Sequence, residues 1–193
     1  MRSCYITLLC GILLMAVSGC HPREKSQSAS SEKAEVEVLK SRYDHADSLY
    51  RHGRIDTAAF NSFINSAMAM AEQSPKADIA PEMLYKAGIG SMILAKSAAT
   101  RNNRDETARY AKQALKIFYD FQELYPDHEN AKYCYYQRGV IYDDILGDYT
   151  SADDQYRDFI NRYPEDSLAS QLRDYLKILG KTESQLEEIM HLE

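Results

Sequence analysis

The sequence predicts an all-α fold, an α-α superhelix built from about eight helices that pair as helical hairpins. Three observations support this prediction. Apolar side chains recur at helical spacing from residue 34 onward, and the alternating Val, Ile and Thr runs that indicate strands are nearly absent. The chain of 193 residues contains only eight Gly and five Pro, and its 45% hydrophobic content is enough to form the core of one domain.

Turn and capping residues divide the chain into the predicted helices. Gly53, Gly147 and Gly180 each follow an apolar periodic segment, where a glycine ends a helix. Thr182 and Gln185 have the spacing of a capping box, so the last helix is predicted to start at Thr182. The helices before it are predicted at residues 34–50, 56–73, 79–99, 105–124, 127–146, 149–162 and 167–179. The fourth helix has the clearest apolar stripe, which we expect to face the core: Tyr110, Ala114, Ile117, Phe118, Phe121 and Leu124.

An internal repeat is visible when the chain is compared with itself. Pro75, Pro126 and Pro164 are each followed five positions later by an alanine. The dipeptide at 88–89, Gly-Ile, lies at the same offset from Pro75 as the dipeptide at 139–140, Gly-Val, lies from Pro126. These matches predict a repeated helical unit in which a proline ends one hairpin and the next begins.

The most regular hairpin is predicted at residues 131–164. Gly139 and Ala152 are small and allow two helix backbones to approach closely, while tyrosines fill the space around them. The residues expected to make this packing are Tyr135, Gly139, Tyr142, Ala152, Tyr156 and Pro164. Their spacing resembles the tetratricopeptide repeat, which implies a stack of such hairpins. Arg138 stands where that family has a leucine, and the chain carries one extra residue between the two helices.

The N-terminus is typical of a secretion signal. Its apolar stretch, residues 5–17, is shorter than the roughly 20 residues that span a bilayer, which favours a cleaved signal peptide at residues 1–19. The sequence Val-Ser-Gly-Cys at 17–20 resembles the lipobox of bacterial lipoproteins, which implies a lipidated Cys20. The alternative is an ordinary signal peptide. Residues 20–33 are polar and Ser-rich, so we expect a lipidated cysteine and a disordered tether before a helical domain at 34–193.

The resemblance to lipoproteins also predicts a location. His21 follows the cysteine, where an Asp would imply retention in the inner membrane, so the outer membrane is favoured. No acidic run of the kind associated with surface export follows Cys20, which favours the periplasmic face.

Composition argues against several classes of function. The net charge of −6 and the lack of a basic run disfavour nucleic acid as a partner. The five His residues are scattered, and no phosphate loop, zinc-type Cys pair or nucleophile motif is present. We therefore expect a non-enzymatic protein without cofactor, catalytic residues or metal ligands. Cys134, which lies between two tyrosines, is interpreted as a buried apolar residue.

The fifth helix carries the candidate binding residues. Its second face holds Tyr133, Tyr136, Val140, Asp143 and Asp144. In tetratricopeptide repeats the corresponding face lines a groove that holds a partner peptide, which implies a partner-binding role here. Tyrosine suits such a surface because it offers a large contact area at low entropic cost. The alternative is that Tyr136 and Val140 simply pack on the neighbouring hairpin, and the sequence leaves both open.

The combined prediction is a lipid-anchored envelope scaffold that binds another envelope protein or a peptide segment of one. Residues 121–179 also resemble the repeats of BamD-type lipoproteins, which implies a role in outer-membrane protein assembly or envelope maintenance. The alternative is an accessory lipoprotein that binds glycans or small ligands. The sequence contains no Trp that could stack on a sugar.

Overall fold

The computed structural model describes residues 22–190. This described part is helical without any strand, which confirms the predicted all-α fold. The predicted signal peptide and Cys20 lie outside the described residues. None of the helices within residues 22–190 is long and apolar enough to cross a bilayer. The chain divides into two compact units, Met1–Glu35 and Val36–Glu193, and the second contains nearly all of the described packing.

The first helix differs from the prediction at its start. α1 runs over Pro22–Arg51, so residues 22–33 are helical where a disordered tether was predicted. Between Pro22 and Arg51 this segment has no Gly or second Pro, and its Ser residues are interspersed with Arg, Glu, Lys and Ala, which have good helix propensity. The low apolar content that suggested disorder is therefore compatible with a polar extension of the helix.

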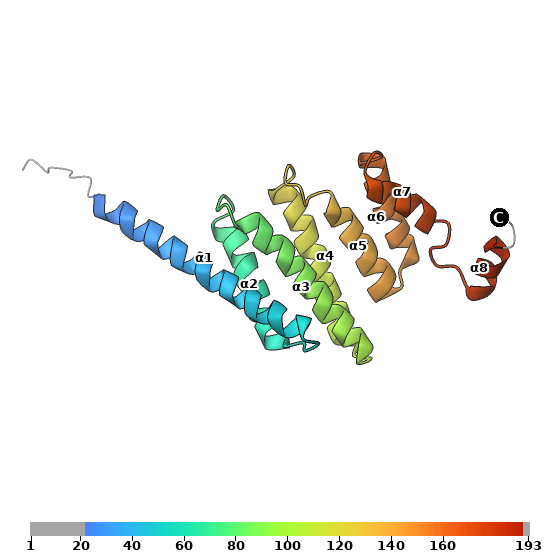
Figure 1. The fold of residues 1–193 in the computed structure, drawn as a ribbon, viewed down its shortest axis with the longest axis horizontal. Helices are drawn as coiled ribbons and strands as arrows, with labels where there is room; N and C mark the ends of the chain where they lie inside the picture. The colour runs from blue at the N-terminus through green and yellow to red at the C-terminus, as the bar shows by residue number, and fades with distance from the viewer. Residues whose placement is uncertain (1–21, 191–193) are drawn as a thin grey trace, which may run out of the picture. The chain divides into compact units, whose positions relative to one another are not determined.

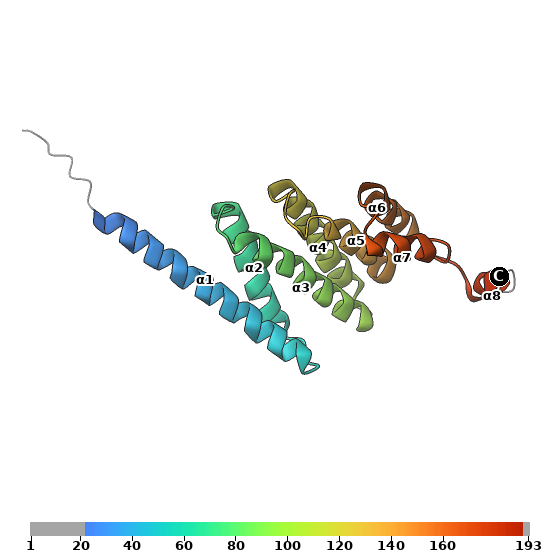
Figure 2. The ribbon, with the colours of Figure 1, turned by 45° about the horizontal axis from the view of Figure 1, so that its top comes forward.

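The second unit is a row of helices. After α1 come α2 (Thr57–Gln73), α3 (Ala80–Thr100) and α4 (Arg104–Leu124), then α5 (Tyr133–Val140), which continues as the π-helix η1 (Ile141–Leu146). α6 (Tyr149–Arg162), α7 (Ser167–Tyr175) and α8 (Glu183–Met190) complete the described chain. Figures 1 and 2 show α2 to α6 side by side in chain order, with short connections that reverse the chain. The predicted hairpin arrangement is therefore present.

The helix ends are set by local signals. α2, α4, α6 and α7 each start at a side chain that accepts a backbone N–H bond within the first turn: Asp56 from Ala59 at 2.9 Å, Asn103 from Glu106 at 3.2 Å, Asp148 from Ser151 at 3.1 Å, and Asp166 from Leu168 at 3.0 Å. Gly147 has a φ of +65°, a left-handed conformation that glycine adopts without strain, and it ends η1 as predicted.

Two further predicted helix ends were wrong. α5 starts at Tyr133 rather than near residue 127, because residues 127–132 form turns in which His128 N–H donates to the Tyr125 carbonyl and Ala131 N–H to that of His128. α7 ends at Tyr175, four residues before the predicted end, and Ile178 N–H closes a further turn onto the Tyr175 carbonyl. In both places the apolar residues keep helical spacing in the sequence, but the chain forms tight turns instead of a helix.

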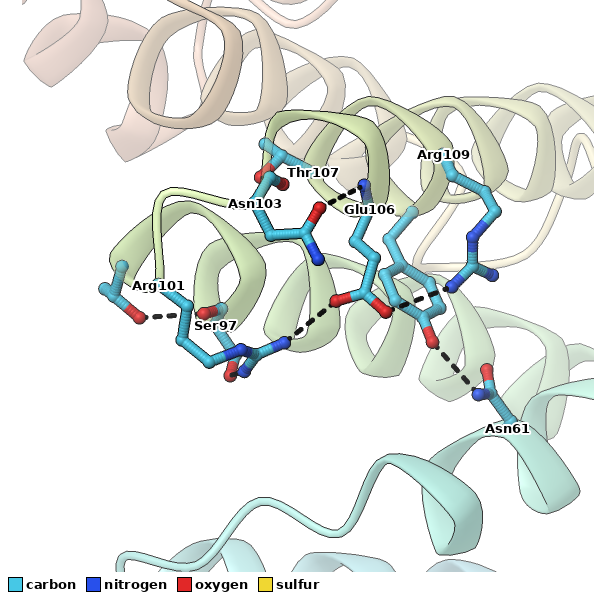
Figure 3. Close-up of polar contacts among 9 residues, drawn as sticks. Asn61, Ser97, Arg101, Asn103, Glu106, Thr107 and Arg109 are labelled. Atoms are coloured by element: carbon cyan, nitrogen blue, oxygen red, sulfur yellow. Dashed lines mark hydrogen bonds and ion pairs between the residues drawn. The ribbon is translucent and has the colours of Figure 1, made fainter.

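The turn between α3 and α4 is closed by a polar network (Figure 3). Arg101 and Arg109 lie on either side of Glu106, with nitrogen to carboxylate distances of 3.1 and 4.0 Å. Further along α4, the Tyr110 hydroxyl accepts a hydrogen bond from Asn61 of α2 at 3.0 Å. Of these contacts, the Asn61–Tyr110 hydrogen bond links the α3–α4 hairpin to α2.

The buried apolar residues form two clusters that meet at α5. The first joins α1 to α4 and includes Cys134 and Ile141 from the next helix, and the second joins α6 and α7 with the tyrosines of α5 around them. Five of the six residues predicted to be buried on α4 lie in the core, but the side chain of Leu124 is 45% exposed. Leu124 is the last residue of α4, where no neighbouring helix covers it fully.

The predicted close packing of α5 against α6 is confirmed at Gly139. A β-carbon at this position would lie only 2.2 Å from Cε1 of Tyr156, whose side chain is 2% exposed. Glycine is therefore the residue that allows this ring to lie flat against the helix backbone.

Arg138, the residue that departs from the repeat pattern, is buried at 2% exposure. Its guanidinium donates to the side-chain oxygens of Gln155, at 2.6 Å, and Gln122. The rings of Tyr119 and Tyr135 lie 4.1 and 4.8 Å from its Cζ atom. Two amide oxygens and two aromatic faces thus take the place of a carboxylate partner and allow an arginine at a leucine position.

Candidate protein-binding groove

The candidate site begins at the change from α-helix to π-helix after Val140. A π-helix has i→i+5 hydrogen bonds and holds more residues per turn than an α-helix. η1 lies between Gly139 and Ala152, the interval in which the sequence has one residue more than the repeat pattern. We infer that the wider turn accommodates the extra residue. It also sets the directions of Asp143 and Asp144, which both lie in η1.

On one side of η1 lies a pocket with a volume of about 320 Å³, which we name the apolar pocket. It is bordered by α3, α5, η1 and the end of α1 with its following loop. Its apolar lining consists of Ile55, Ile89, Met92, Ile93, Val140 and Ile145. At its edge, Lys96 Nζ lies 3.5 Å from a carboxylate oxygen of Asp144, and both side chains are at least half exposed. This pocket is suited to a large apolar side chain.

On the other side of η1 lies a second pocket of about 440 Å³, bordered by α5, η1, α6 and α7, which we name the tyrosine pocket. Tyr136, Tyr156 and Tyr175 line it together with Asp143. The Tyr175 hydroxyl donates to Oδ2 of Asp143 at 2.5 Å, and the Tyr156 hydroxyl lies 3.4 Å from the same oxygen. Burial, followed by the hydrogen bond to Asp143, raises the pKa of Tyr175, so this phenol stays a donor at neutral pH.

The two pockets adjoin, because Val140 and Asp144 line both of them. We name the two adjoining pockets together the η1 groove. Tyr85 of α3 and Gln137 of α5 meet beneath it, where the Gln137 amide donates to the Tyr85 hydroxyl at 3.2 Å. Burial raises the pKa of Tyr85 to about 12, so its hydroxyl remains protonated and holds α3 against α5.

The structure places four of the five predicted binding residues on the η1 groove. Tyr136 and Asp143 line the tyrosine pocket, and Val140 and Asp144 line both pockets. Tyr133 lines neither of these pockets; its ring is half-buried against the second core cluster, with Lys132 Nζ 4.8 Å from the ring centroid. Tyr136 also packs against Tyr156, with ring centroids 6.2 Å apart. Tyr156 belongs to α6 of the same hairpin, so this contact is packing within the hairpin and not on the neighbouring one.

Other helices contribute a part of the groove that was not predicted. Ile89, Met92, Ile93 and Lys96 of α3, together with Gln171 and Tyr175 of α7, were not among the predicted site residues. The internal repeat held a signal for α3, because Ile89 lies at the same offset from Pro75 as Val140 from Pro126. No comparable signal marked Tyr175, whose contact with Asp143 joins residues that are 32 positions apart.

The fold and the groove define a class of protein that consists of a row of antiparallel helical hairpins. Its apolar site lies between the first helices of two successive hairpins. Within this row of hairpins, residues 133–166 match the tetratricopeptide repeat family. The chain therefore carries a tetratricopeptide repeat, a module that generally serves protein–protein interaction. No curated protein matches this chain. Among the described residues, no group of three or more His, Cys, Asp or Glu side chains is arranged to hold a metal ion.

Proposed function

We propose that this protein is a membrane-anchored scaffold of the bacterial envelope that binds a segment of another envelope protein in the η1 groove. The observation that carries the proposal is the joining of two pockets at Val140 and Asp144, inside the one hairpin that matches the tetratricopeptide repeat. A groove with apolar side chains at its floor and polar groups at its edge is suited to an extended or helical peptide.

The proposed anchor is a lipid on Cys20, at the outer membrane and facing the periplasm. Its support is the sequence at residues 17–20 and the residue that follows it. Several acyl chains on one residue give firm attachment, because each buried CH₂ contributes about 0.8 kcal/mol. A scaffold held there would meet outer-membrane and periplasmic proteins, and a role in outer-membrane protein assembly or envelope maintenance follows as the finer proposal.

The binding site is tested by photocrosslinking in intact cells. A photoreactive amino acid replaces Val140 in the groove, and a matched sample carries it at Glu129, an exposed residue of the α4–α5 turn that lines neither pocket. We expect one predominant protein adduct at Val140, identified by mass spectrometry, and none at Glu129. Absence of an adduct at Val140 above the sample kept in the dark, in cells that contain the protein at its normal level, would contradict the proposal.

The anchor is tested separately with Cys20→Ala. We expect the wild-type protein to fractionate with outer membranes and to incorporate an alkyne-labelled fatty acid, and the variant to lose both properties. Added protease should cleave the wild-type protein only after the outer membrane is opened. Cleavage in intact cells would contradict the periplasmic orientation, and membrane association without label in both proteins would contradict the lipid anchor.

A further inference from the structure

The tyrosine pocket differs from the apolar pocket in its charge. Its lining contains two carboxylates, Asp143 and Asp144, and none of its described lining residues is Lys, Arg or His. Lys96, which lines the apolar pocket, lies 3.5 Å from a carboxylate oxygen of Asp144, and both side chains are at least half exposed. Such an exposed pair is weak and easily exchanged. The lining of the pocket therefore carries a net negative charge, which an exposed ion pair to Asp144 offsets only weakly.

The aromatic walls add a second attraction of the same sign. Tyr136 and Tyr175 both pack against Tyr156, with ring centroids 6.2 and 5.9 Å apart, and both are only half-buried. An aromatic face attracts a cation that lies within about 6 Å of its centroid. The hydroxyls of Tyr156 and Tyr175 point toward Oδ2 of Asp143, at 3.4 and 2.5 Å, which fixes this carboxylate at the pocket wall. A ligand thus meets a preorganised carboxylate beside two half-buried tyrosine rings.

We propose that the tyrosine pocket binds a lysine or arginine side chain of the partner segment, while the adjoining apolar pocket binds a large apolar side chain of the same segment. This inference rests on the proposed function and specifies its partner by chemistry. Because the pockets share Val140 and Asp144, the two side chains come from one continuous segment. The partner is a protein with an exposed segment that combines an apolar anchor and a nearby basic residue.

The first experiment selects short random peptides, displayed on phage, on the purified full chain held in mild detergent. The same selection is made on Asp143→Asn with Asp144→Asn, which removes two negative charges from the pocket. A matched control, Asp127→Asn with Glu129→Gln, removes two exposed charges from the α4–α5 turn. We expect peptides selected on the wild type and on the control to carry Lys or Arg at one position near an apolar residue, and this preference to disappear on the pocket variant.

A double-mutant cycle then isolates the contact in solution. One selected peptide is synthesised with its basic residue and with norleucine in its place, and the Kd of each is measured by fluorescence anisotropy. We expect the norleucine peptide to bind the wild type about five- to tenfold more weakly than the basic peptide does. On the pocket variant, the two peptides should have the same Kd. Added salt should weaken binding of the basic peptide to the wild type more than that of the norleucine peptide.

Asp143 accepts hydrogen bonds from two tyrosines, so replacing it could unfold the pocket locally. A second variant tests the charge of the pocket without changing Asp143. Gln171→Lys places an ammonium at the edge of the pocket from an exposed position on α7 and leaves Asp143 and its donors in place. It should weaken binding of the basic peptide by a similar factor, with a thermal unfolding curve close to that of the wild type.

The outcomes separate the two proposals. Selected peptides without a basic preference, or with the same preference on the wild type and the pocket variant, would overturn the basic-residue site and leave the peptide-binding scaffold intact. If no peptide binds the wild type or the control above background, the proposed function fails, and the basic-residue site fails with it.

Discussion

Replacing Gly139 by alanine should destabilise the protein although alanine is the better helix former. In a helix interior the exchange by itself gains about 0.5–1 kcal/mol. Here the added methyl group would lie 2.2 Å from Cε1 and 2.5 Å from Cδ1 of Tyr156, well inside van der Waals contact. The ring cannot turn aside freely, because it is 2% exposed and packs between Tyr136 and Tyr175.

Overpacking of this kind costs about 1–3 kcal/mol, so the free energy of unfolding should fall by about 1–2 kcal/mol in total. For a chain of this length the corresponding fall in Tm is about 2–8 °C. Urea denaturation followed by circular dichroism measures the change. Gly90→Ala is the matched control, because its nearest contact, Cδ1 of Phe60, would be 3.2 Å away and its cost should be smaller.

The Tyr156→Leu background tests the cause. Without the ring, Gly139→Ala should become neutral or stabilising by about 0.5 kcal/mol. If alanine at 139 raises the stability of the wild type, or lowers it equally with and without the Tyr156 ring, the clash with this ring is not the cause.

Four further predictions concern other parts of the fold. Arg138→Ala should lower the free energy of unfolding by about 3 kcal/mol in urea denaturation, because it leaves a cavity and deprives Gln122 and Gln155 of their donor. Arg138→Leu refills the space and should lower this free energy by less. Equal losses for the two variants would contradict the role of the cavity. Burial raises the pKa of the Cys134 thiol from 9.0 to about 12, so in the native protein peptide mapping should find it unmodified by iodoacetamide at pH 8; labelling as fast as in the unfolded chain would refute its burial. The same shift means that the folded state binds the thiol proton more tightly, so this contribution to stability is complete below pH 9.0 and is lost as the pH rises toward about 12; Cys134→Ala should show a shallower loss of stability over this range. Asp56→Ala removes the cap of α2 and should lower the stability by about 1 kcal/mol, whereas Asp56→Asn, which keeps the acceptor for Ala59, should cost little in the same assay.

The boundaries of most helices followed from the sequence because their signals are local. Gly147 can adopt the left-handed conformation that ends η1, and the side chains of Asp148 and Thr182 lie beside the helix starts they mark. At Thr182 the predicted capping box is half formed, since Gln185 accepts from the Thr182 N–H at 2.9 Å while the Thr182 hydroxyl contacts Ser184. These interactions join residues within one turn, so no knowledge of other helices is needed.

The close approach at Gly139 also followed from the sequence, because a small residue with large neighbours at helical spacing indicates a point where two helices touch. Helical periodicity grouped five residues on one side of the fifth helix, and the resemblance to the tetratricopeptide repeat implied that this side carries a groove; four of the five residues line the η1 groove. Their role in binding a partner stays a prediction.

Only the tertiary structure decided which side chains from distant helices meet. The burial of Arg138 depends on Gln122 and Gln155, which approach it from α4 and α6, and the Asp143 carboxylate meets Tyr175 because α6 packs against both η1 and α7. The π-helix adds to this, since one extra residue in a turn rotates every following side chain. Local signals determine where each helix begins and ends, whereas the rotation and spacing between helices, which depend on the packing of all of them together, determine the groove.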